Sequence, residues 1–141
     1  MIKKINKISE KTSLIILNND SYNNLEKYNF SEEIYNYIKQ QHKEKAEIVS
    51  INTYKKWIFI IFTNTKKADF LIKEDLRHKS HKLYSRIKNT KISEIQIIDN
   101  INNKDYLLAF SEGFSLSCYN FLKYFSKNEK KDNNLKNIYI Y

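Results

Sequence analysis

Short apolar runs alternate with amphipathic segments along this chain. The apolar runs are rich in isoleucine and end in polar turn formers, which is typical of buried strands. They lie at residues 13–17, 47–51, 57–62, 92–98 and 136–140. The run at 57–62, Trp-Ile-Phe-Ile-Ile-Phe, is so uniformly apolar that we expect both of its faces to be covered, in the middle of a sheet.

Three other segments have the periodicity of helices. Ser31 is placed to cap the first, with two glutamates in the first turn, where the helix dipole favours negative charge. This helix should run to about residue 41. The second pattern covers residues 74–88, although Thr65 is an alternative cap that would start it earlier. The third is one long amphipathic segment at 106–125.

Strands interleaved with helices predict an α/β fold. We expect a three-layer sandwich in which helices flank a central mixed sheet of about five or six strands. The chain has 141 residues and is 41% hydrophobic, which suits one domain over residues 1–141. Because the sequence ends directly on a strand, we expect it to be part of a longer protein.

The only glycine of the chain, Gly113, lies inside the third helical segment. Glycine costs about 1 kcal/mol relative to alanine in a helix interior, so its presence needs a reason. Ala109, Gly113 and Ser117 are spaced at i, i+4 and i+8, which makes a narrow stripe without bulk. We expect this close-packing stripe to lie tightly on the sheet or on a neighbouring helix.

The formal net charge of +9 raises the question of nucleic acid. Nearly all of the basic residues are lysines, with only Arg77 and Arg86 as arginines, and the chain is also rich in isoleucine, asparagine and tyrosine. An A/T-rich genome explains that composition without any nucleic-acid surface. Bidentate recognition of bases and phosphates favours arginine, so nucleic acid is the second interpretation of the charge.

Composition also indicates a compartment. No apolar run approaches the roughly 20 residues that span a bilayer, and the first residues lack the apolar block of a signal peptide. The single cysteine, Cys118, can form no internal disulfide. We therefore expect a cytoplasmic protein without a membrane partner.

Two local patterns are candidates for chemistry. His78 and His81, with Glu74 one turn earlier, have the spacing of metal ligands on a helix. A solvated polar face is the better interpretation, because the apolar stripe lies on the other side of that helix. Cys118 is a candidate nucleophile, but it aligns with Phe110, Phe114, Phe121 and Phe125 on an apolar stripe, where a small buried side chain is expected.

The segment Leu108-Ala-Phe-Ser-Glu-Gly-Phe-Ser-Leu-Ser-Cys-Tyr-Asn-Phe-Leu-Lys-Tyr124 resembles a helix near the end of the N-terminal domain of leucyl aminopeptidases. In that family an alanine and Glu-Gly precede small and aliphatic residues and then Tyr-x-Phe. The lysine-rich loop that follows, before a short strand, is similar to the family too. Lys73-Glu-Asp-Leu-Arg-His-Lys-Ser-His-Lys-Leu83 resembles the family's Glu-x-Leu-Arg-Lys-Ala-Gly helix, with Ser80 near a position where members carry glycine or alanine.

This resemblance implies the non-catalytic part of a metallopeptidase that releases N-terminal amino acids from peptides. In the family a C-terminal catalytic domain binds two divalent metal ions, zinc or manganese, partly through an Asn-Thr-Asp-Ala-Glu-Gly-Arg motif. That motif is missing from this chain, and its acidic residues are scattered. We therefore predict no catalytic, metal-binding or cofactor-binding residue here, with the C-terminal domain and further copies in a hexamer as partners. An assembly or access role follows.

The resemblance extends to the macrodomain fold and so raises ADP-ribose as a ligand. Macrodomain-type pockets cradle phosphates with glycine-rich loops, which a chain with one helical glycine lacks. Two hypotheses remain for this macrodomain-like domain. It is either the non-catalytic N-terminal domain of a leucyl aminopeptidase-like enzyme or a stand-alone basic module that binds nucleic acid.

Overall fold

The computed structural model describes residues 2–123 and 135–141. Its strands are Ile2–Lys4 (β1), Ser13–Asn19 (β2), Ile48–Asn52 (β3), Trp57–Thr63 (β4), Glu94–Asp99 (β5) and Asn137–Ile140 (β6). Its helices are the 3-10 helix Asn23–Tyr28 (η1) and the α-helices Glu32–Lys43 (α1), Asp69–Ile87 (α2) and Lys104–Lys123 (α3). No helix within these ranges is long and apolar enough to cross a lipid bilayer.

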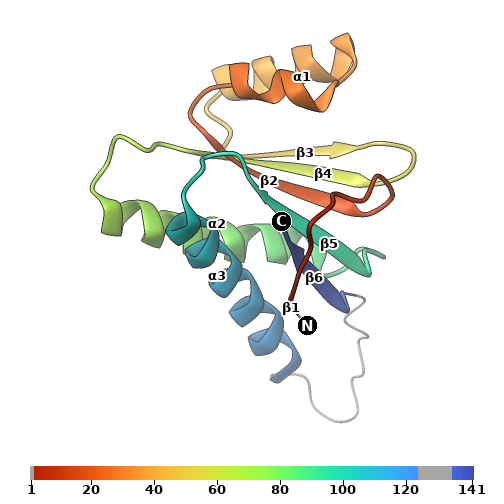
Figure 1. Cartoon of the computed structure of the whole chain (residues 1–141), viewed down its shortest axis with the longest axis vertical. Helices are drawn as coiled ribbons and strands as arrows, with labels where there is room; N and C mark the ends of the chain where they lie inside the picture. The colour runs from red at the N-terminus through yellow and green to blue at the C-terminus, as the bar shows by residue number, and fades with distance from the viewer. Residues whose placement is uncertain (1, 124–134) are drawn as a thin grey trace.

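The strands form one mixed sheet in the order β1-β6-β5-β2-β4-β3. All neighbours are parallel except β3, which pairs antiparallel with β4. Helix α1 covers one face of the sheet, whereas α2 and α3 lie together on the other (Figure 1). The predicted three-layer α/β sandwich with a mixed sheet of about six strands is confirmed.

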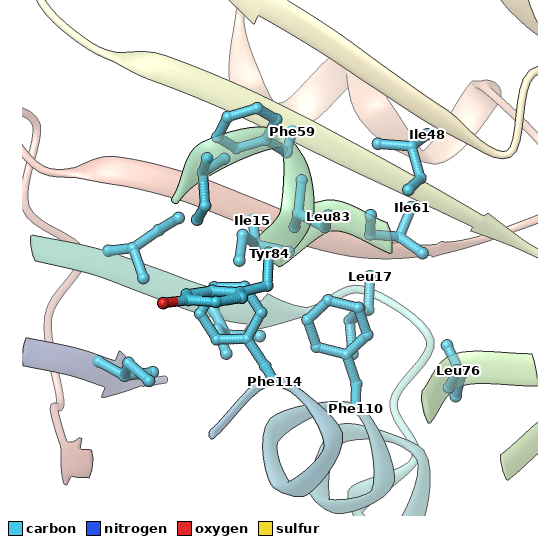
Figure 2. Packing of buried hydrophobic residues seen from close by; sticks show 14 of the residues in the cluster. Ile15, Leu17, Ile48, Phe59, Ile61, Leu76, Leu83, Tyr84, Phe110 and Phe114 are labelled. Atoms are coloured by element: carbon cyan, nitrogen blue, oxygen red, sulfur yellow. The ribbon is translucent and has the colours of Figure 1, made fainter. Parts of the chain in front are cut away.

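Successive side chains of β2 point into different cores. Leu14 and Ile16 belong to the cluster beneath α1, and Ile15 and Leu17 belong to the cluster beneath α2 and α3. In the second cluster Phe110 and Phe114 reach from α3 towards the strands (Figure 2). Strand β4 is buried from its second residue onward, so the prediction that both of its faces are covered is confirmed. It lies between β2 and the edge strand β3, whereas β5 and β2 form the middle of the sheet.

Helix α1 begins as predicted. The side chain of Ser31 accepts a hydrogen bond from the backbone N–H of Ile34 at 3.3 Å, which satisfies one of the free donors of the first turn. The helix ends at Lys43, two residues beyond the expected end.

The start of α2 differs from both expectations. The helix begins at Asp69, five residues before the predicted start, and its N-cap is Ala68 rather than Thr65. An ion pair of 3.0 Å between Asp69 and Lys73 stabilises the first turn instead of a side-chain cap. The first turn of α2 lacks the apolar periodicity from which the helix was predicted. Phe70, the residue after Asp69, is apolar but exposed, so it does not belong to the buried face.

Two elements were not predicted at all. All three residues of β1 are exposed, and the strand is held by pairing with β6, more than a hundred residues away in the sequence. The short helix η1 places the fully buried side chain of Leu25 against the sheet. Neither element has the apolar repeat by which the others were found. The lysine-rich loop expected after the third helix, and the end of that helix beyond Lys123, fall outside the described residues.

Two residues of the close-packing stripe, Gly113 and Ser117, face α2. Residues of α3 meet those of α2 in the same order along both helices: Gly113 adjoins Arg77 and Ser80, and Ser117 adjoins His81. The two helices therefore run parallel, as two crossovers on one face of a parallel sheet must. Ala109 is buried, with 2% of its surface exposed.

Candidate functional site

The carboxyl ends of β2 and β5 are where this type of sheet is expected to bind a ligand. The two strands are neighbours, and the chain leaves β2 towards α1 on one face but leaves β5 towards α3 on the other (Figure 1). In open α/β sheets ligands bind in the crevice at such a point, outside the carboxyl ends of the strands.

Side-chain amides join the ends of these two strands. The Nδ2 of Asn100 donates to Oδ1 of Asn18 at 2.6 Å, and both side chains are buried. The backbone N–H of Asn100 donates to the carbonyl oxygen of Leu17 at 2.8 Å, and Asn18 donates in turn to the carbonyl oxygen of Ser21. The loops after the two strands are thus joined to one another where a ligand would enter.

The carboxylate of Asp99 occupies the backbone donors of the loop after β5. Its Oδ1 accepts from the N–H groups of Ile101 at 2.9 Å and Asn102 at 3.1 Å, and its Oδ2 accepts from Asn103 at 2.8 Å. Successive N–H groups of this kind are what phosphate-binding loops offer to an anion. Here the chain's own carboxylate takes the place that a phosphate oxygen would take.

The first turn of α3 is satisfied in the same way. Oδ1 of Asn103 accepts from the backbone N–H of Asp105 at 3.0 Å and of Tyr106 at 3.2 Å. Asn102, between the two capping residues, has a positive φ of 60°, a conformation that asparagine tolerates better than most side chains. A loop without glycine therefore makes a tight turn and closes it with its own polar side chains.

A cleft of about 600 Å³ opens at the same edge, beside β4. On one side Nε2 of His42 lies 3.0 Å from Oδ1 of Asp20. On the other, Nζ of the buried Lys79 donates to Oδ2 of Asp75 and to the carbonyl oxygen of Phe62, each at 2.7 Å. The described lining residues include no serine, threonine or cysteine.

The candidate metal ligands on α2 do not converge. Glu74 forms an ion pair of 2.9 Å with Arg77, and Nδ1 of His81 lies 3.2 Å from the hydroxyl of Ser117 on α3. His78 is exposed. In the ranges that the structure describes, no three histidine, cysteine or acidic side chains lie close enough to share a metal ion.

The thiol of Cys118 is half-buried against the apolar core, next to Tyr84. Burial raises its pKa from 9.0 to about 11, and only weaker hydrogen-bonding and charge effects oppose this. A protonated thiol is a poor nucleophile, so this position suits packing. Phe110 and Phe114 lie in the same core, while the side chains of Phe121 and Phe125 fall outside the described residues.

Comparison with known proteins gives a fold but no family. No family model matches the chain, and no curated protein matches it. A mutant of tomato leucine aminopeptidase superposes with a TM-score of 0.67 at 11% identity, over 99% of this chain and 32% of that one. The chain thus spans about a third of the tomato enzyme.

Two macrodomains superpose equally well. The macrodomain of Mycobacterium tuberculosis DarG gives a TM-score of 0.65 at 8% identity, over 99% of this chain and 97% of that one. The macrodomain of Thermus aquaticus DarG gives 0.64 at 10% identity, over 100% of this chain and 97% of that one. The chain therefore has a macrodomain-like α/β fold.

Proposed function

We propose that this domain is the non-catalytic N-terminal domain of a leucyl aminopeptidase-like metallopeptidase and serves in assembly or access rather than in chemistry. The full-length enzyme would release N-terminal amino acids from peptides, with two zinc or manganese ions in a separate C-terminal domain. The resemblance of residues 108–124 to the family and the superposition on the tomato enzyme support this proposal.

The observation that carries the proposal is the position of the Asp99 carboxylate. A macrodomain fold suggests ADP-ribose as a competing ligand, and free backbone N–H groups at a helix N-terminus are what binds a diphosphate. Three such groups already bind Asp99, and those of Asp105 and Tyr106, in the first turn of α3, bind Asn103. Bringing a second anion to this loop would place it against a carboxylate.

An assembly role requires a contact surface, and α2 and α3 offer one. Large apolar side chains are exposed on this layer: Phe70, Leu71, Leu108, Leu116 and Tyr119. Exposed apolar side chains that gather on one layer are typical of protein–protein contacts. We assign this surface to the catalytic domain or to another copy of the enzyme.

Three measurements test the proposal. The chain alone should not hydrolyse leucine amide with added manganese or zinc, and calorimetric titration with ADP-ribose should give no heat of binding. The reading frame beyond residue 141 should encode about 300 further residues with the metal-binding motif, since the family exceeds one domain. Hydrolysis by the chain, micromolar affinity for ADP-ribose, or a reading frame without that domain would each refute it.

In the protein that carries this second domain, Leu116→Asp should reduce the assembled mass measured by sedimentation velocity. Tyr37→Asp is the matched control, because Tyr37 is also exposed but lies on α1, on the other face of the sheet. Equal loss of mass in the two variants would mean that the α2 and α3 surface has no special part in assembly.

A further inference from the structure

A second groove, of about 460 Å³, lies at the opposite edge of the sheet, at the amino ends of β2, β4 and β5. Three segments line it, namely residues 11–13, 52–57 and 91–94. We propose that this groove binds single-stranded nucleic acid, with lysines on the phosphates and an exposed tyrosine stacked on a base. The inference goes beyond the proposed function and does not depend on it.

Four lysines give the groove its charge. Lys11, Lys55, Lys56 and Lys91 line it, and none of the four forms an ion pair with a carboxylate among the described residues. The single acidic lining residue, Glu94, already accepts hydrogen bonds of 3.1 Å from Asn137 and 2.9 Å from Tyr139. The groove therefore has a surplus of positive charge for an anion.

An aromatic ring stands beside these lysines. Tyr54 is completely exposed, with a relative accessibility of 110%, at the tip of the turn between β3 and β4. Hydrogen bonds close the turn, because the N–H and hydroxyl of Thr53 both donate to the carbonyl oxygen of Lys56, at 3.0 and 2.7 Å. An aromatic ring without apolar neighbours on an ordered turn is available to stack on a base.

The rest of the groove is also ordered before any ligand arrives. The fully buried side chain of Gln96 accepts from the N–H of Ser9 at 3.0 Å and donates to its carbonyl oxygen at 2.6 Å, which fixes the segment before Lys11 on β5. The partly buried ring of Trp57 stacks on Phe59 with centroids 5.7 Å apart and an angle of 1° between the rings. A preorganised site loses less entropy on binding.

The chemistry favours single strands over duplexes and predicts little sequence preference. Bases of a duplex are already stacked on one another and cannot also stack on Tyr54, whereas unpaired bases can. The described lining residues contain no arginine, the side chain that most often reads guanine edges. Lysines bind phosphates as point charges, which positions a strand without reading its sequence.

Fluorescence anisotropy with labelled oligonucleotides of about twelve residues tests the proposal. Oligothymidylate, oligouridylate and a duplex of the same length are compared at about 50 and 200 mM salt. We expect one or both single strands to bind more tightly than the duplex and to lose affinity steeply with salt. The single strand that binds more tightly, oligothymidylate or oligouridylate, shows whether the groove prefers DNA or RNA. Absence of binding to both at low salt overturns the proposal.

Matched variants locate the site. Tyr54→Ala should weaken single-strand binding about 5- to 150-fold, the loss expected for one stacked base, whereas Tyr37→Ala, at an exposed tyrosine on α1, should not. Lys55→Gln with Lys91→Gln should reduce the slope of log affinity against log salt by about 1.4. The control pair is Lys43→Gln with Lys45→Gln, which removes equal charge from the opposite cleft.

Equal losses in the groove and control variants would overturn the proposal, because binding would then follow net charge alone. Circular dichroism of each variant confirms that it is folded before its affinity is compared. Because these side chains are largely exposed, their replacement should leave the fold intact.

Discussion

A Cβ atom placed on Gly113 of α3 would lie 3.1 Å from the Cα of Arg77 on α2, closer than two carbon atoms pack. The missing side chain of Gly113 is therefore the reason that the two helix backbones approach so closely. The adjoining hydroxyl of Ser80 bonds to the carbonyl oxygen of Arg77 at 2.6 Å, so it too is held within α2. The contact between α2 and α3 therefore leaves no room for a side chain at position 113.

Gly113→Leu should lower the free energy of unfolding by about 1–3 kcal/mol or more through overpacking. Gly113→Ala should also destabilise the fold, because the close contact of the new Cβ atom with the backbone of Arg77 outweighs the gain of about 1 kcal/mol in helix propensity. Urea denaturation followed by circular dichroism measures both. Glu112→Ala is the control, at an exposed position of the same helix. A Gly113→Leu variant as stable as the parent would refute the close-packing interpretation.

Asn100→Ala should cost about 1–3 kcal/mol, because it leaves the buried Oδ1 of Asn18 without its donor. Replacing both asparagines by alanine should cost less than the sum of the two single changes, since the pair shares one hydrogen bond. A double-mutant cycle in urea measures the coupling. Additive losses would show that the two amides do not act together.

Cys118 should react slowly with iodoacetamide. With its pKa raised to about 11 by burial, about one thiol in a hundred is ionised at pH 9, compared with half for a thiol of pKa 9.0. We expect alkylation, followed by mass spectrometry, to be roughly fiftyfold slower at pH 9 in the native chain than in urea. A native rate equal to the unfolded rate would place the thiol in solvent.

The sheet was predictable because its strands β2 and β4 carry runs of apolar side chains on both faces. Residues 57–62 show this most clearly, and both faces of β4 are covered as the pattern indicated. The cap at Ser31 was predictable because a single side chain and the N–H of Ile34 define it. Such signals are local, so one sequence is enough to find them.

The hydrogen bond that joins the ends of β2 and β5 was not predictable, because the two asparagines that form it are far apart in the sequence. Nothing near Asn18 indicates that Asn100 will lie beside it. From the sequence alone, the carboxylate of Asp99 could equally bind a ligand or accept from the backbone N–H groups of its own loop. The burial of Lys79 was missed for a related reason. Helix α2 packs against both the sheet and α3, so more than one of its faces is covered.

Stability at alkaline pH should depend on Tyr84. Its ring is buried edge-on against Phe114, with centroids 5.8 Å apart, and burial, with Cys118 nearby, raises its pKa from 10.0 to about 12. The folded state therefore binds this proton more tightly than the unfolded state does. The resulting stabilisation is complete below pH 10 and is lost as the pH rises through 12.

Tyr84→Phe keeps the ring and removes the titrating group, so its free energy of unfolding should fall less than the parent's over this range. Urea titrations at intervals of pH measure the difference, with the exposed Tyr37→Phe as the control that should follow the parent. Identical curves for Tyr84→Phe and the parent would mean that the phenol of Tyr84 ionises as freely in the folded chain as in the unfolded one.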